Sequence, residues 1–246
     1  MYLLETKGLT KRFGGLTAVD NVNFKVAKGD RRAVIGPNGA GKTTFFNLIA
    51  GRLPPTQGEI WFKGEDITHI PPYRIPQKGI GRSYQITNIF SKLPVFENVR
   101  LAAQAVEVTY DFWTNVISMD DINGRVTEIL EKLKLIDYRD VRAANLPHGL
   151  QRHLEIGIAL ASRPELLLLD EPTAGMTQEE TRRMMELIED IAEGLTIVVV
   201  EHDMKFVMSI SKRITVLHEG KVLAEGPPEE IRKNEDVQRV YLGKEV

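Results

Sequence analysis

The 246-residue chain contains no cysteine, so neither a disulfide nor a thiolate metal site can form. It has no apolar run near the ~18 residues that a bilayer-spanning helix requires. Residues 1–5 lack the basic and then apolar pattern of a secretion signal. Its 32 Lys and Arg are balanced by 34 Asp and Glu, which leaves no basic surface for nucleic acid. These absences favour a cytoplasmic protein that reaches a membrane only through partners.

One glycine-rich stretch matches the phosphate-binding loop of nucleoside triphosphatases. Its residues are Gly36, Pro37, Asn38, Gly39, Ala40, Gly41, Lys42, Thr43 and Thr44. Glycine has no Cβ, so backbone N–H groups can approach phosphate oxygens closely. Lys42 supplies a positive charge near the β- and γ-phosphates, and the Thr43 hydroxyl is placed to coordinate Mg²⁺. A predicted strand over 32–35 and a predicted helix over 43–50 flank the loop, and this context favours a phosphate site over a bare glycine-rich turn.

Two carboxylates follow the most hydrophobic stretch of the chain. Residues 166–169 are four leucines, which predict a strand buried on both faces. Asp170 and Glu171 come at its carboxyl end, where open α/β sheets bind ligands. Asp170 can hold Mg²⁺ through a water molecule, and Glu171 is a candidate general base that polarises the attacking water. The alternative is a solvated or helix-capping acidic pair.

Four further residues are less informative when each is taken alone. His202 follows a second buried strand, 195–200, and can donate a hydrogen bond to a γ-phosphate. Gly149 stands at a predicted helix start and is a candidate second anion site, directed away from the chain's own phosphate loop. Phe13 lies in a glycine-rich segment and either stacks on a base or covers the core. Gln85 ends a predicted strand and, by itself, indicates nothing.

The element pattern predicts one α/β domain over 1–246. Helical periodicity replaces the strand signals over 87–162, which predicts a helical subdomain inserted in the chain. Residues 1–86 and 163–246 then form the nucleotide-binding core and a β-subdomain. Thr177 and Glu180 have the spacing of a capping box, which predicts a helix start. The aromatic segment 110–113 either packs within the helical subdomain or forms a surface for a partner.

The order of these motifs resembles the ATP-binding cassette of ABC transporters over the whole chain. The resemblance implies a P-loop NTPase ABC cassette with a RecA-like core, an antiparallel β-subdomain and a helical subdomain, which binds ATP and Mg²⁺. It implies that Phe13 stacks on adenine, that Gln85 is a catalytic and metal-binding Q-loop residue, and that His202 is the switch histidine. Glu171 would be the catalytic base. The signature motif is implied at 146–151, where the contacts to ATP of the opposite subunit would come from Pro147, His148 and Gly149.

Four segments resemble one branch of this family more narrowly, namely the ATPase subunits of branched-chain amino-acid uptake systems and their urea and amide relatives. The segments are 83–90, 149–156, 174–177 and 241–243. This branch implies an importer ATPase that works with a second cassette, two permease subunits and, indirectly, a solute-binding protein, on the inner face of the plasma membrane. An exporter cassette and a soluble ABC ATPase of DNA repair or translation are the alternatives. A GTPase would need an Asn-Lys-x-Asp run, which is absent.

Two positions depart from the family pattern. The usual signature is Leu-Ser-Gly-Gly-Gln, but Pro147 and His148 replace its serine and first glycine, and Leu150 replaces its glutamine. Proline offers neither a hydroxyl nor an N–H to a phosphate. Thr177 stands where the D-loop usually ends in aspartate. Both departures favour a heterodimer with a more ordinary cassette over a symmetric homodimer.

Overall fold

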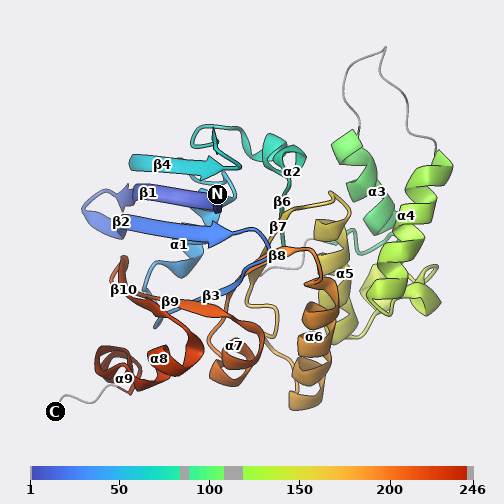
Figure 1. The fold of residues 1–246 in the computed structure, drawn as a ribbon. Coiled ribbons are helices and arrows are strands. Elements are labelled where there is room, and N and C mark those ends of the chain that lie inside the picture. The colour runs from blue at the N-terminus through green and yellow to red at the C-terminus, as the bar shows by residue number, and fades with distance from the viewer. Residues whose placement is uncertain (1, 84–88, 108–118, 243–246) are drawn as a thin grey trace.

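The computed structural model describes residues 2–83, 89–107 and 119–242 (Figure 1). The strands in these ranges are β1 (Tyr2–Phe13), β2 (Leu16–Ala27), β3 (Arg31–Ile35), β4 (Gln57–Phe62), β5 (Glu65–Asp66), β6 (Ile80–Arg82), β7 (Leu166–Asp170), β8 (Thr196–Val200), β9 (Arg213–His218) and β10 (Lys221–Gly226). The α-helices are α1 (Lys42–Ile49), α2 (Ile75–Lys78), α3 (Val95–Glu107), α4 (Met119–Lys132), α5 (His148–Leu160), α6 (Gln178–Ile191), α7 (Met204–Ile210), α8 (Pro228–Lys233) and α9 (Glu235–Leu242).

A six-stranded sheet with the order β10-β9-β3-β8-β7-β6 forms the centre of the molecule. β6, β7, β8, β3 and β9 run parallel, and the β9–β10 hairpin closes one edge with an antiparallel pair. Parallel strands all end at the same edge of a sheet, which is where such sheets bind ligands. The segments that follow β3, β7 and β8 therefore meet at one edge.

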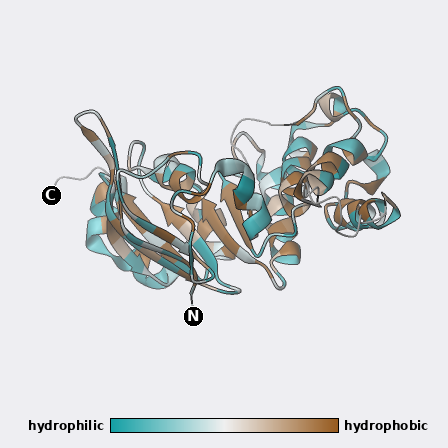
Figure 2. Cartoon of the chain, turned by 90° about the horizontal axis from the view of Figure 1, so that it is seen from above, coloured by the Kyte–Doolittle hydropathy of each residue, from teal (hydrophilic) through white to brown (hydrophobic). Residues whose placement is uncertain are grey.

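Both faces of this sheet are buried, as the predicted run of leucines required. Residues 166–169 have no exposed surface. Successive side chains point to opposite faces, so Ala33 and Ile35 pack with the cluster that contains α5, α6 and α7. Val34 packs on the other face with α1 and the antiparallel strands. In Figure 2 the strands in the middle of the molecule are mostly brown, that is, hydrophobic.

The amino-terminal strands form a second, antiparallel sheet with the order β2-β1-β4-β5. Its presence agrees with the antiparallel β-subdomain that the resemblance implied. Phe13 is the last residue of β1 rather than a loop residue, because its pairing continues to Leu16. The ring of Phe13 is 46% exposed, so it does not cover the core.

A helical lobe lies to one side of the core, where α5 separates α3 and α4 from the sheet (Figure 1). The helical periodicity predicted within 87–162 is confirmed in α4, where Ile122, Val126 and Leu130 are buried on one face. The apolar spacing of α5 predicts one buried face, but α5 is buried on most sides, including Arg152 and Glu155, because it packs against both the lobe and the core. Within the ranges given above, no helix is long and apolar enough to cross a membrane. Segment 110–113 lies outside the described residues.

Candidate nucleotide site

The phosphate-loop glycines are required for two different reasons. A Cβ on Gly36 would lie 2.2 Å from the carbonyl oxygen of Leu217, and one on Gly41 would lie 2.2 Å from that of Ala18. These two glycines allow the loop to pack closely on its neighbours. Gly39 has φ +81° and open space within 4 Å of its Cβ direction, so it serves the loop's left-handed shape and not its packing. The loop is therefore anchored at both ends and open in its middle.

Lys42 begins α1 and is held by the loop itself. Its Nζ donates to the carbonyl oxygen of Gly36 at 2.6 Å and to that of Pro37 at 3.0 Å. Burial lowers the pKa of Lys42 below its ordinary value, and the negative charges of Glu171 and Asp170 oppose that shift. The lysine thus lies in the field of both carboxylates predicted from the sequence. The neighbouring Thr43 is exposed, as a residue that receives a ligand must be.

Asp170 is almost completely buried at the end of β7. Its Oδ2 accepts from Arg82 Nη2 at 2.9 Å, and Arg82 Nη1 also donates to Asn47 in α1 at 2.8 Å. The other oxygen, Oδ1, is buried without a hydrogen-bond partner among the described residues. A buried carboxylate oxygen of this kind needs a donor or a cation. Arg82 was not identified from the sequence, although its position at a strand end near Gln85 was a weak signal.

Glu171 follows directly and has an unusual backbone. Its φ is +47°, in the left-handed region that residues with a side chain rarely adopt. The N–H of Glu171 donates to the carbonyl oxygen of Val200 at 2.8 Å, which ties this turn to the end of β8. Strained conformations of this type cluster at functional sites. The turn places the half-buried Glu171 near the buried Lys42.

His202 lies at the end of the adjacent strand β8. Its side chain is 65% exposed, and Nδ1 lies 3.6 Å from Oε2 of the fully buried Glu201. Asp203 caps α7 by accepting from the N–H of Lys205 at 2.8 Å. Three of the sequence-predicted residues, Asp170, Glu171 and His202, thus come from neighbouring strand ends. Gln85 lies outside the described residues, and its role stays a prediction.

The carboxyl-terminal helix also reaches the phosphate loop. Burial raises the pKa of Tyr241 in α9 to about 12, and the backbone of Gly36 partly offsets this rise. The side chain of Tyr241 packs against the same cluster as α6 and α7. Tyr241 therefore lies near the start of the phosphate loop.

The altered signature segment begins α5. Pro147 is its N-cap and makes no side-chain capping bond, and both Pro147 and His148 are exposed. Gly149 is buried, and a Cβ there would lie 3.0 Å from Oε1 of Glu180. His148 Cε1 lies 3.5 Å from the Cβ position of Gly175. The signature segment thus lies against the segment that follows Glu171 in the same chain.

Thr177 fixes the position of Glu180, whose carboxylate lies against Gly149. Its Oγ1 accepts from the N–H of Glu180 at 3.3 Å, and Glu180 Oε2 accepts from the N–H of Thr177 at 2.9 Å, so the predicted capping box is confirmed. The N–H and the hydroxyl of Thr177 both donate to the Glu180 carboxylate and hold its pKa below the ordinary value. The threonine found in place of the D-loop aspartate is therefore used to begin α6.

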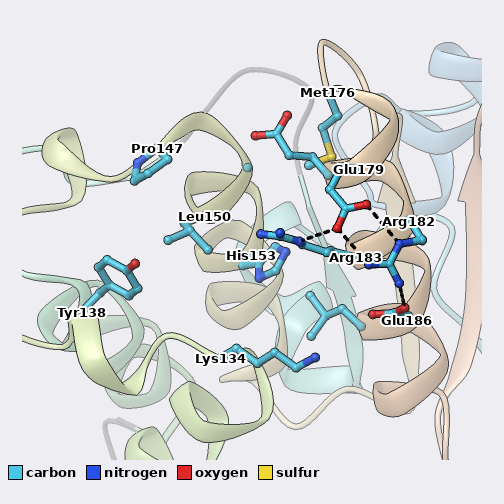
Figure 3. Close-up of a pocket in the computed structure, with 13 residues that line it drawn as sticks. Lys134, Tyr138, Pro147, Leu150, His153, Met176, Glu179, Arg182, Arg183 and Glu186 are labelled. Carbon is cyan, nitrogen blue, oxygen red and sulfur yellow. Dashed lines mark hydrogen bonds and ion pairs between the residues drawn. The ribbon is translucent and has the colours of Figure 1, made fainter.

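A pocket of about 560 Å³ separates the start of α5 from α6 (Figure 3). Pro147 and Met176 line it from the signature segment and the segment before α6. Arg182, which also lines it, lies 2.8 Å from Glu179 and 2.5 Å from Glu186. Two carboxylates therefore already neutralise the charge of this arginine.

Comparison with known proteins decides the family. The family model described as ABC transporter matches residues 19–174, and the model described as branched-chain amino acid ATP-binding cassette transporter matches 221–246. The chain belongs to the ABC transporter family. It is 40% identical to the high-affinity branched-chain amino acid transport ATP-binding protein LivG of Escherichia coli strain K12 over 98% of both chains, and equally to BraF of Pseudomonas aeruginosa. It is also 32% identical to the lipopolysaccharide export ATP-binding protein LptB of Escherichia coli, over 100% of this chain and 99% of LptB.

Solved structures agree with this assignment. A nucleotide-free ATP-binding cassette from an ABC transporter superposes with a TM-score of 0.87 at 28% identity, covering 99% of this chain and 100% of the other. A dimeric cassette in a post-hydrolysis state with ADP and Pi gives a TM-score of 0.79 at 26% identity, covering 92% and 98%. The chain is thus a cassette that binds and hydrolyses ATP for transport, as the resemblance implied. Such cassettes work in pairs and on permease subunits.

Proposed function

We propose that this cassette powers the import of branched-chain amino acids, or of a related small amide such as urea, through one composite ATP site per phosphate loop. The observation that supports the site is the convergence at one sheet edge of the phosphate loop, the strained Glu171, the exposed His202 and Asp170, whose Oδ1 has no partner among residues 2–83, 89–107 and 119–242. The whole chain is proposed to act as one domain, with 87–162 as its helical subdomain.

The residues present fit a Mg²⁺ ion beside the triphosphate. Mg²⁺ prefers carboxylate, hydroxyl and water oxygens, and the buried Asp170 Oδ1 has no hydrogen-bond partner within the described part of the chain. We assign the ion to Thr43 and Gln85, with Asp170 acting through water. When bound, the ion would neutralise charge on the β- and γ-phosphate oxygens.

The chain's own residues then have separate roles in hydrolysis. When ATP binds, Nζ of Lys42 would leave the carbonyl oxygens of Gly36 and Pro37 and donate to phosphate oxygens instead. The negative phosphate would favour the charged form of this lysine, whose pKa burial lowers. Glu171 accepts the proton of the attacking water, and His202 donates to the γ-phosphate. Phe13 offers an exposed ring for adenine stacking, with Lys11 Nζ 5.3 Å from its centroid.

The second half of each site is proposed to come from another cassette. Pro147 and His148 are exposed at the start of α5 and would face the nucleotide of that subunit, with Gly149 beneath them. Because Pro147 supplies no donor, a site completed by this chain has fewer phosphate contacts than one completed by Leu-Ser-Gly-Gly-Gln. This difference supports a heterodimer in which the partner carries the ordinary signature.

The heterodimer makes a direct prediction. Steady-state ATPase activity per cassette should rise about tenfold or more when the chain is co-expressed with a sister cassette that carries the ordinary signature, because one lost charge-assisted hydrogen bond costs at least this much. The control is the Pro147→Ser variant of this chain alone, which should gain part of that activity. Equal activity of the chain alone and of the mixture would contradict the heterodimer.

The substrate class rests on the relatives and on the carboxyl terminus. The branched-chain amino-acid model covers 221–246, which includes α8 and α9, and Tyr241 of α9 lies near the start of the phosphate loop. The 40% identity to LivG and BraF over nearly the full chain supports the same class. The match to LptB keeps export as the competing function.

An uptake assay separates import from export. Cells that lack this chain should lose high-affinity uptake of labelled leucine, isoleucine and valine, and the wild-type gene should restore it. The permease subunits are proposed to attach at a groove of about 230 Å³ between α2, α3 and α5. The same uptake assay tests this attachment. Ala105→Glu in that groove should abolish uptake while ATP binding by the purified chain is kept. Unchanged uptake of these three amino acids in the deletion strain would contradict branched-chain amino-acid import.

A further inference from the structure

The carboxylate of Glu201 links the two segments that carry Glu171 and His202. Glu201 is fully buried at the end of β8. Its Oε1 accepts from the N–H of Thr173 at 3.0 Å and also from the Thr173 hydroxyl. Its Oε2 accepts from the N–H of His202 at 2.9 Å and from that of Asp203 at 3.4 Å. Four donors from two different loops therefore converge on one side chain.

This arrangement begins where the strand pairing ends. β7 and β8 pair as far as Asp170 and Val200, and the N–H of Glu171 makes the last ladder-like bond to Val200. Beyond that bond the two backbones belong to separate loops, and the Glu201 carboxylate connects them. His202 itself has a largely exposed side chain, so its backbone N–H is a principal point at which its position is fixed.

The same carboxylate reaches the segment before α6. Thr173 lies two residues after Glu171, and its carbonyl oxygen accepts from the N–H of Met176 at 3.1 Å. The carbonyl oxygen of Glu171 accepts from the N–H of Ala174 at 3.1 Å. A shift of Thr173 would therefore move both Glu171 and the segment that contacts His148.

We propose that Glu201 is a positioning residue that sets the distance between the general base Glu171 and the switch residue His202. The inference rests on the proposed roles of those two residues, and it adds a residue that touches neither nucleotide nor water. Binding of ATP depends on the phosphate loop, with which Glu201 makes no hydrogen bond among the described residues. The proposal therefore places the effect on turnover and not on nucleotide affinity.

Glu201→Gln is a stringent test, because all four contacts need an acceptor oxygen. A carboxylate accepts at both oxygens, whereas a carboxamide has one oxygen and one NH₂ group. In Glu201→Gln the NH₂ would face either the two Thr173 donors or the N–H groups of His202 and Asp203. One side of the link is lost in either orientation, although size and burial are unchanged.

The test compares kinetic constants of purified full-length variants with Mg²⁺ and ATP. Glu201→Gln and Thr173→Val should each lower kcat by roughly tenfold or more, with the Kd for ATP within about twofold of wild type. Thr173→Ser restores the hydroxyl and should return kcat close to wild type. The double variant should be no slower than the slower single variant, because both changes break one link.

Thr215→Val is the matched control. Thr215 is buried in β9 and its hydroxyl donates to Glu225 at 3.1 Å, which is the same kind of contact away from His202. It should lower the thermal midpoint and leave kcat unchanged. A folded Glu201→Gln variant with wild-type kcat, or a Thr173→Ser variant as slow as Thr173→Val, would overturn the positioning role. If Glu201→Gln does not fold, the two Thr173 variants decide alone.

The outcome for Glu171→Gln distinguishes a failure of the proposed ATP site from a failure of the positioning role of Glu201. If Glu171→Gln keeps hydrolysing ATP, the proposed site fails and Glu201 has no base to position. If Glu171→Gln is inactive while the Glu201 and Thr173 variants are fully active, the site stands and only the positioning role fails.

Discussion

Glu171→Gln should abolish ATP turnover while it leaves ATP binding intact. The substitution keeps the size of the side chain but removes the oxygen that accepts the proton of the attacking water. A loss of general-base catalysis lowers kcat by about 10²- to 10⁴-fold. The left-handed φ of +47° and the N–H bond to Val200 belong to the backbone, so glutamine can adopt the same turn. The site therefore remains assembled around an inert group.

Binding and chemistry are measured separately for this variant. Saturating ATP should stabilise both proteins, by about 2.7 kcal/mol at 100 times the Kd, so the variant should show the wild-type thermal shift. Steady-state phosphate release should fall to background. The control is Glu179→Gln, an exposed carboxylate in α6 whose pKa is lowered to about 2 by Arg182 and Arg183, which should hydrolyse ATP normally. Turnover retained by Glu171→Gln would remove Glu171 from the base role.

Local sequence patterns were sufficient to predict the site residues that lie close together in the chain. Lys42 and Thr43 belong to one nine-residue loop, and Asp170 and Glu171 directly follow a run of leucines, so spacing alone identified them. The capping box at Thr177 and the buried strands were equally local. The family and the α/β fold followed from the order of these segments and are confirmed by the comparisons.

The contacts that connect distant segments could not be predicted in this way. Arg82 reaches Asp170 across 88 positions, and Thr173 reaches Glu201 across 28, because β6, β7 and β8 are neighbours in the sheet. The residues around Arg82 give only a weak signal of this strand order, and those around Glu201 give none. The sequence therefore identified His202 by its type and place but not the buried Glu201 beside it.

The second large effect is expected in the phosphate loop. Alanine in place of Gly36 should lower stability, whereas alanine in place of Gly39 should lower ATP affinity. Gly36→Ala places a methyl group 2.2 Å from the backbone oxygen of Leu217 and 2.9 Å from Ala40 Cβ. Leu217 pairs with Val222 of β10, so its backbone cannot move aside without disturbing the β9–β10 hairpin. Overpacking of this severity should lower the free energy of unfolding by about 3 kcal/mol or more, and it should be visible as a much lower thermal midpoint.

Gly39→Ala should instead lower ATP affinity. Its Cβ meets nothing within 4 Å, so the empty loop can relax away from φ +81°, and nucleotide binding must then restore the strained shape. Left-handed alanine costs about 1–2 kcal/mol, which corresponds to a loss of roughly 5- to 30-fold in affinity. Gly29→Ala is the matched control, because Gly29 has φ +78° and equally open surroundings but precedes β3, at the opposite end of the strand from the loop. Calorimetric ATP titration should show weaker binding for Gly39→Ala alone. Equal affinities in the two variants would show that the loop's left-handed glycine is not part of the ATP site.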